Sequence, residues 1–264
     1  MTITPTYVPP GEGELSLGHV FASAWDLFVA NFSKFFLITL VVALPNLLVD
    51  PMPTPGTAAA GWRGVAALVG FVLNMIAQAM ILYIAFQYLR GQSASLSDAA
   101  QKGLAGFFPI LGTGILFVLG AWIVPLLLAI LLSAVLFFIG VFLAPIVMIV
   151  LAGMLTSRWF VAIPACVLER LGPIASLGRS AALTKGHRWK IFGMLLIVFV
   201  TIIAVGAVIG ISFFVAGRIV GSLVNLVVVA VWAAYFNSMW VMLYHDLRVA
   251  KEGVDVDQIA AVFD

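Results

Sequence analysis

The sequence contains 55 consecutive residues, 103–157, without an aspartate, glutamate, lysine or arginine. A helix needs about 20 apolar residues to cross a hydrocarbon core of about 30 Å, so this stretch is long enough to cross it twice. Apolar residues make up 64% of the chain and charged residues only 9%. Backbone groups in lipid must be hydrogen-bonded within their own segment, and these apolar runs are too long for barrel strands. The sequence therefore predicts an all-α, polytopic membrane protein.

The hydropathy pattern predicts a bundle of six transmembrane helices. They lie near residues 31–50, 64–89, 107–130, 133–156, 191–213 and 220–244. The turn between the third and the fourth, around Leu131–Ala134, has no charged residue to mark it. We expect a disordered segment over 1–15 that lacks the features of a signal peptide, one transmembrane domain over 16–246, and a short cytoplasmic tail over 247–264.

The cations are distributed unequally between the two sides of these predicted spans. Eleven of the 13 lysines and arginines fall in the segments of one side, and only Arg63 and Arg218 fall on the other. Cytoplasmic loops carry an excess of lysine and arginine. The pattern therefore predicts that both termini are cytoplasmic.

Three short segments on the cytoplasmic side are similar to one another. Residues 17–28 and residues 96–107 each form an amphipathic pattern after a serine, and ASLSDAAQKG from Ala94 is similar to ASLGRSAALTKG from Ala175. Two predicted spans follow each segment, which indicates three repeats of about 80 residues, each an interfacial helix and a hairpin. The alternative is three unrelated helix starts, because small residues match easily by chance.

The second half of the chain resembles a known group. The similarity rests on Pro164, Arg179-Ser180, Leu183-Thr184-Lys185-Gly186, Trp189, Ile191-Phe192-Gly193, and, near the end, Leu243-Tyr244 and Asp246-Leu247-Arg248. These residues resemble the bacterial six-span membrane proteins of the YciC-like group, also described as the membrane domain of glycerophosphoryl diester phosphodiesterases. The chain departs from the group at Ala181, where an aromatic residue is common. The resemblance implies a location in the bacterial inner (cytoplasmic) membrane, and it implies no established activity.

The search for catalytic and metal-binding patterns indicates no enzyme. His19, His187 and His245 lie far apart, without the spacing of metal ligands. The single cysteine, Cys166, excludes an intrachain disulfide and a cysteine pair for a metal. His245 and Asp246 are adjacent in sequence and do not share a helix face, so a catalytic dyad is not expected. We therefore predict no catalytic residue, no cofactor and no metal.

A basic cluster beside the fifth predicted span is the strongest functional lead. It consists of Arg179, Lys185, Arg188 and Lys190. Juxtamembrane cations gain about 1 kcal/mol each near an anionic leaflet, so the cluster could contact lipid headgroups or the acidic face of a partner. The alternative role is orientation and anchoring alone. A nucleic-acid partner is not expected, because the net charge is only +2 and the cations lie beside the bilayer.

Uncharged residues inside the spans provide two further candidates. Asn74 and Gln78 are four residues apart on the second span and could line a path for a lipid or a small molecule, or simply hydrogen-bond between helices. Gly206 and Gly210 form a GxxxG pair on the fifth span, which allows close packing within the bundle or self-association.

Two classes of function remain open from the sequence. The first is a non-catalytic scaffold or accessory subunit that supports a membrane-protein partner or binds anionic lipid, and the absence of buried charge favours it. The second is a carrier for a lipid or another amphipathic solute, with a cavity between the repeats. The sequence does not indicate the partner, the solute or the oligomeric state.

Overall fold

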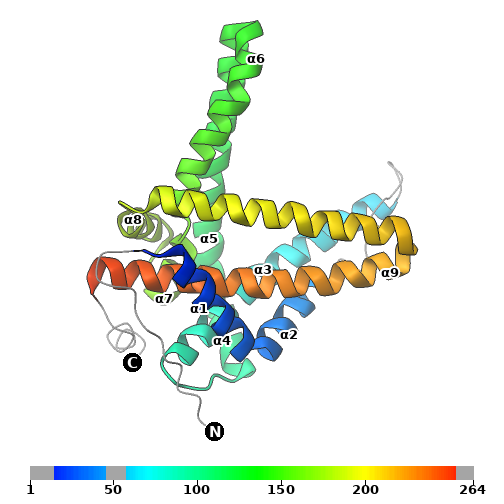
Figure 1. Ribbon diagram of the computed structural model, residues 1–264, viewed down its shortest axis with the longest axis vertical. Coiled ribbons are helices and arrows are strands. Elements are labelled where there is room, and N and C mark those ends of the chain that lie inside the picture. The colour runs from blue at the N-terminus through cyan, green and yellow to red at the C-terminus, as the bar shows by residue number, and fades with distance from the viewer. Residues whose placement is uncertain (1–14, 46–57, 254–264) are drawn as a thin grey trace. The chain divides into compact units, whose positions relative to one another are not determined.

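The computed structural model describes residues 15–45 and 58–253, without the side chains of residues 58–63, 137, 138 and 141. Over these ranges the chain is helical and contains no strand, so the predicted all-α class is confirmed. The helices in chain order are α1 (Leu17–Ala30), α2 (Phe32–Ala43), α3 (Ala58–Leu89), α4 (Leu96–Ala105), α5 (Phe107–Val118), a π-helical turn (Leu119–Ile123), α6 (Val124–Trp159), α7 (Ala162–Leu168), α8 (Pro173–Leu183) and α9 (Arg188–Glu252) (Figure 1). Most of the expected segment 1–15 and of the expected tail 247–264 lies outside the described residues.

The described chain forms two compact units. The first unit contains residues 18–107 and 198–242, and the second contains residues 15–17, 108–197 and 243–253. The long α9 therefore contributes its middle to the first unit and its two ends to the second. Each unit is described by itself.

In the first unit, α1 and α2 meet at a sharp bend at Asn31. The two helices are inclined by 87°, and Asn31 is buried, with its amide Nδ2 donating to the Leu27 carbonyl at 3.2 Å. Val20 and Phe28 on the predicted apolar face of α1 are buried in the protein. The Phe28 ring lies 5.9 Å from that of Tyr235 on α9, so much of this face packs on protein.

The same unit contains the turn of a helical hairpin inside α9. Gly217 has φ 74° and ψ −175°, a backbone conformation that is essentially restricted to glycine. The break at Gly217 divides α9 into two arms that run back along each other (Figure 1). The arms meet closely beside the turn, because a Cβ on Gly221 would lie 2.5 Å from the Phe213 ring. The turn falls between the predicted fifth and sixth spans.

In the second unit, α6 also reverses its direction. A Cβ on Gly140 would lie 2.7 Å from the Ser133 Cα, whereas residues seven apart in a straight helix are about 10 Å apart along the axis. The reversal lies between Ser133 and Gly140. The turn therefore lies a few residues later than the sequence indicated.

The π-helical turn before α6 has a local cause in the sequence. Pro125 follows it and has no N–H to donate to a helix carbonyl. A π-turn is one way in which a helix accommodates such a gap. Close packing occurs at the same place, because a Cβ on Gly120 would lie 2.4 Å from the Trp159 ring.

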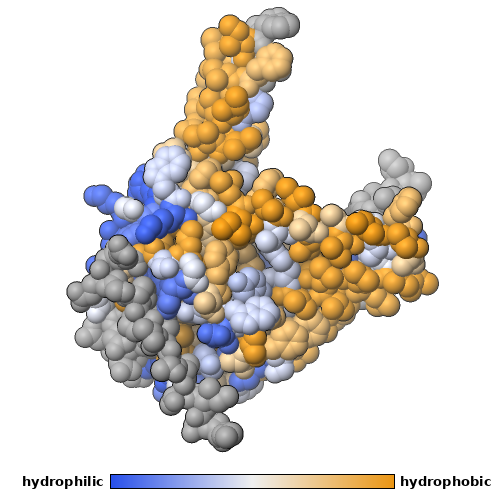
Figure 2. All heavy atoms as spheres, in the orientation of Figure 1, coloured by the Kyte–Doolittle hydropathy of each residue, from blue (hydrophilic) through white to orange (hydrophobic). Residues whose placement is uncertain are grey.

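Four stretches of the described helices are long and apolar enough to cross a membrane, with α9 counted once, and there are five if the bent pair of α1 and α2 is one span. Many of their large apolar side chains lie on the surface, including Phe214 at 90% and Ile219 at 79% exposure. Figure 2 shows this apolar surface on the arms of α9 and on α6. Soluble monomers rarely expose such large contiguous apolar surfaces. The structure is thus consistent with a membrane protein.

Candidate functional site

The second unit contains a network of ion pairs that we name the Glu169 cluster: Glu169, Arg179, Tyr244, Arg248 and Glu252. Arg179 on α8 lies between two carboxylates. Its Nε donates to both carboxylate oxygens of Glu169 at 2.8 Å, and its Nη2 is 2.5 Å from Glu252 Oε1. The planar guanidinium offers five donors in a fixed arrangement, so it can bind two carboxylates at once.

The other members of the cluster come from the last turns of α9. Tyr244, Arg248 and Glu252 are spaced four residues apart and therefore share one face of the helix. The Tyr244 hydroxyl donates to Glu169 Oε1 at 2.6 Å, and Arg248 Nε donates to Glu252 Oε2 at 3.0 Å. Arg248 Nε is also 3.9 Å from Glu169 Oε1. With two carboxylates and two guanidinium groups, the Glu169 cluster is electrically neutral.

The contacts in the Glu169 cluster shift the pKa values of Glu252 and Arg179. Partial burial opposes the charge on Glu252, but the hydrogen bonds from Arg179 and Arg248 outweigh it and lower the Glu252 pKa from its usual value. Partial burial also opposes the charge on Arg179, and the hydrogen bonds from Glu169 and Glu252 outweigh it and raise the Arg179 pKa. Both side chains are therefore held in their charged forms.

The structure separates Arg179 from the three other cations of the predicted basic cluster. Lys185 is exposed, and Lys190 is exposed while its Nζ donates to the Leu15 carbonyl at 2.8 Å. Arg188 is half-buried, and its Nη2 donates to the Ala181 carbonyl at 3.3 Å. Arg179 cross-links the fold, whereas Lys185 and Lys190 present charge to the surroundings.

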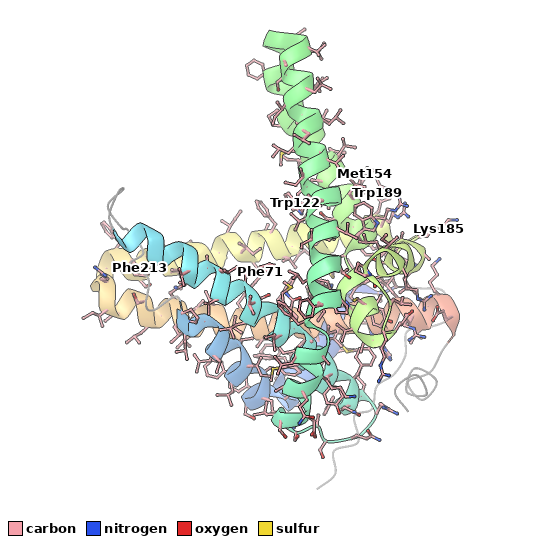
Figure 3. The ribbon with its side chains drawn as sticks, turned by 180° about the vertical axis from the view of Figure 1, so that it is seen from behind. Phe71, Trp122, Met154, Lys185, Trp189 and Phe213 are labelled. Atoms are coloured by element: carbon pink, nitrogen blue, oxygen red, sulfur yellow. The ribbon has the colours of Figure 1, made fainter. Side chains whose placement is uncertain are left out.

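An exposed tryptophan lies among these cations. Trp189 is 79% exposed, and Figure 3 shows Trp189 and Lys185 extending from the region where α8 is followed by α9. We name the set Lys185, Arg188, Trp189 and Lys190 the basic surface. Figure 2 shows hydrophilic residues gathered in this region. Tryptophan and lysine side chains at a membrane boundary place their polar groups among the headgroups.

The polar residues of α8 face the protein instead of water. Ser176, Ser180 and Thr184 are spaced four apart and are fully buried. The hydroxyls of Ser180 and Thr184 both donate to the Arg158 carbonyl at 3.0 Å. These two hydroxyls satisfy a backbone acceptor at the end of α6. Ser180 and Thr184 therefore have a structural role.

In the first unit, Asn74 and Gln78 line a cavity of 260 Å³ between α2, α3 and the second arm of α9. The Gln78 amide Nε2 donates to Asn74 Oδ1 at 2.7 Å. Asn237 and Thr39 also line the cavity. The predicted pair of polar residues is thus brought together with two further polar residues from distant parts of the chain.

Gly206 and Gly210 are exposed on the first arm of α9. A Cβ added at either position would meet no atom within 4 Å. The close packing that the GxxxG spacing allows is therefore not found among the described residues.

The histidines and the cysteine form no recognisable reaction centre in the described part of the chain. His245 Nδ1 lies 3.5 Å from Asp246 Oδ1, and both side chains are fully buried. Within residues 15–45 and 58–253, no group of three or more histidine, cysteine, aspartate or glutamate side chains is arranged to hold a metal ion. Cys166 is buried, and its Sγ lies 3.4 Å from the Leu171 carbonyl.

The residue that sequence reasoning missed is Glu169. It is the only acidic residue between Asp98 and Asp246, and it lies in a segment rich in cations. A single carboxylate among cations needs an opposite charge as partner if it is buried. This isolated glutamate was the signal in the sequence that indicated an ion pair. The partners Arg248 and Glu252 could not be assigned to it from spacing, because they are about 80 residues away in the chain.

No family model, no curated protein and no solved structure matches the chain.

Proposed function

We propose that the protein is a non-catalytic, multi-pass protein of the bacterial inner membrane that acts as a scaffold or accessory subunit and binds anionic lipid at its basic surface. The observation that carries the proposal is the exposure of Lys185, Trp189 and Lys190 beside long apolar helices, while Arg179 is held by Glu169 and Glu252. The exposed cations Lys185 and Lys190 are thus distinct from Arg179, which is held in an ion-pair network.

The proposed topology has six spans with both termini in the cytoplasm. The spans are the predicted segment 31–50, of which α2 is the described helix, then α3, the two arms of the reversed helix that contains α5 and α6, and the two arms of α9. The turn at Gly217 and the reversal near Gly140 support counting two spans in each of these long helices. A short helix precedes each pair of spans, namely α1, α4 and α8, which supports the proposed three repeats of about 80 residues. Membership of the YciC-like group remains part of this proposal.

The charge on the basic surface suits the headgroups of anionic lipid. Juxtamembrane cations contribute about 1 kcal/mol each near an anionic leaflet, and an interfacial tryptophan adds an anchor. A lipid phosphate can accept hydrogen bonds from an ammonium group at several angles, because lysine presents a rotatable charge with three donors. The same surface could bind the acidic face of a membrane-protein partner.

The scaffold role is tested by isolating the tagged full chain from its native membrane in mild detergent, followed by quantitative proteomics. We expect a membrane protein at near-stoichiometric yield. The Lys185→Gln/Lys190→Gln variant should recover less of a partner that docks on the basic surface, whereas the control Lys102→Gln, which removes an exposed cation of α4, should recover as much as the parent chain. Recovery of the chain alone, at a yield that excludes loss during isolation, would contradict the scaffold role.

A second candidate function is a carrier for a lipid or another amphipathic solute. The polar cavity between α2, α3 and α9 favours it, because substrate sites of transporters lie near the middle of the membrane, and Asn74 and Gln78 lie in the middle of the predicted second span. Transport of a fluorescent lipid between the leaflets of vesicles that contain the purified protein would support this candidate. An unchanged leaflet distribution would contradict it.

A further inference from the structure

We propose that the cavity between α2, α3 and the second arm of α9 is a binding site for a neutral glycerolipid, such as a diacylglycerol. The inference rests on the proposed membrane location and is independent of the scaffold role. It concerns the first unit only, so it does not involve the basic surface of the second.

The position and lining of the cavity place polar groups deep in an apolar protein. Asn74 and Gln78 lie in the middle of the predicted second span, and Asn237 lies in the predicted sixth. Small residues make most of the remaining wall and leave space beside the amides. These residues are Ala43, Ala66, Ala67, Gly70, Ala77 and Ala233. A cavity needs both space and polar partners to hold a polar ligand, and this one has both.

The hydrogen bonds within the protein do not use all the polar atoms at the cavity. Asn74 Oδ1 accepts from Gln78, and the Asn237 amide Nδ2 donates to the Ala233 carbonyl at 2.8 Å. Gln78 Oε1 is buried and has no hydrogen-bond partner among the described residues. Each side-chain amide carries two N–H donors and an oxygen with two lone pairs, so the bonds within the protein leave hydrogen-bonding capacity at Asn74, Gln78 and Asn237 for a ligand hydroxyl or ester.

Thr39 contributes differently to the cavity wall. Its hydroxyl oxygen lies 2.9 Å from both the Phe35 carbonyl and the Ala230 carbonyl, so its hydrogen is used within the protein. The oxygen retains lone pairs that can accept a hydrogen bond. Thr39 also joins α2 to α9 through its hydrogen bond to Ala230.

The charge and the size of the site select the class of ligand. Among the side chains that the structure describes, none that lines the cavity is charged, so a phosphate or an ammonium group has no counter-charge from these residues in a medium of low dielectric constant. The cavity volume is 260 Å³. That is enough for a glycerol-sized group with its ester bonds, and too little for a whole lipid.

A neighbouring cavity can take a hydrocarbon chain. It has a volume of 200 Å³, its lining residues are all apolar, and it shares Val42 and Ala77 with the polar cavity. A polar site beside an apolar one fits a ligand with a hydroxyl and ester head and acyl chains. A neutral glycerolipid combines these features.

The experiment is photo-labelling of the full chain in phosphatidylcholine vesicles with a diacylglycerol that carries a diazirine near its glycerol. We expect labelling to concentrate on the segment 66–78 and to be competed by unlabelled diacylglycerol. Asn74→Leu/Gln78→Leu should reduce this labelling roughly thirty-fold, because it removes two hydrogen-bonding groups at about 1 kcal/mol each. Ala233→Phe, which fills the cavity and keeps the amides, should reduce it similarly.

The matched control is Asn225→Leu, which removes an amide of the same arm of α9 that does not line the cavity. It should leave labelling unchanged. The inference is overturned if Asn74→Leu/Gln78→Leu and Ala233→Phe both label like the parent chain, or if a diazirine phosphatidylcholine labels the same segment equally, which indicates boundary lipid only. Equal labelling by a phosphatidic acid analogue overturns the neutral class. None of these results depends on Lys185 or Lys190, so the proposed function is tested separately.

Discussion

Replacing Arg179 by glutamine should destabilise the protein strongly, although the residue belongs to a basic segment near the surface. The substitution removes a charge that lies between Glu169 and Glu252, with contacts of 2.8 Å and 2.5 Å. Hydrogen bonds to charged groups contribute about 1.5–3 kcal/mol each, so two of them are worth about 3–6 kcal/mol. The Arg179 side chain is 25% exposed and the new glutamine can keep one bond, so we expect a loss of about 2–4 kcal/mol.

The assay is unfolding in mixed micelles of a mild detergent and dodecyl sulfate, followed by circular dichroism. Lys185→Gln is the matched control, because it removes an exposed cation six residues away and should change the free energy of unfolding by less than about 0.5 kcal/mol. The double variant Arg179→Gln/Glu252→Gln should lose less than the sum of the two single variants, by about 1–2 kcal/mol. Equal stability of Arg179→Gln and Lys185→Gln would refute the structural role of the Glu169 cluster.

Three further predictions follow from single positions. The Glu252 pKa is lowered in the folded state, so the ionised carboxylate stabilises the fold above its unfolded pKa of about 4.3, and this stabilisation is lost as the pH falls through the lower folded value. A titration of the free energy of unfolding against pH should show this loss, and Glu252→Gln should abolish it. Gly217→Ala should cost about 1–3 kcal/mol because of its positive φ, whereas Gly206→Ala, in open space, should not destabilise; thermal unfolding of both variants compares them. Gly153→Ala should lower the unfolding temperature, because its Cβ would lie 2.4 Å from the Phe192 ring, and Gly153→Ala/Phe192→Leu should recover part of the loss.

The helical class could be predicted because composition alone determines it. Backbone groups in lipid have no partner but one another, so a chain with 64% apolar residues and runs such as 103–157 has few alternatives to helices. The turn at Gly217 was placed correctly because Arg218 interrupts the apolar pattern there. The reversal near Gly140 was placed too early because no charged residue marks it, and close packing of Gly140 on Ser133 is not visible in hydropathy.

The functional residues were predictable where neighbours in sequence are neighbours in space. Asn74 and Gln78 are one helical turn apart, so their contact follows from periodicity. Asn237 joins them only through the packing of α9 on α3, which spacing does not encode. In the same way, Arg179 was grouped with Lys185 because the two are close in the chain. In the folded protein, Arg179 instead forms an ion pair with Glu169.

The proposed contact between the basic surface and anionic lipid is tested most directly by measuring the phospholipid that co-purifies with the full chain. The comparison is between the parent chain, Lys185→Gln/Lys190→Gln and the control Lys102→Gln, which removes an exposed cation of α4. Two cations at about 1 kcal/mol each predict roughly a ten- to thirty-fold loss of affinity for anionic lipid in the double variant, with no loss in the control. Equal amounts of anionic lipid on all three proteins would contradict the proposed role of the basic surface.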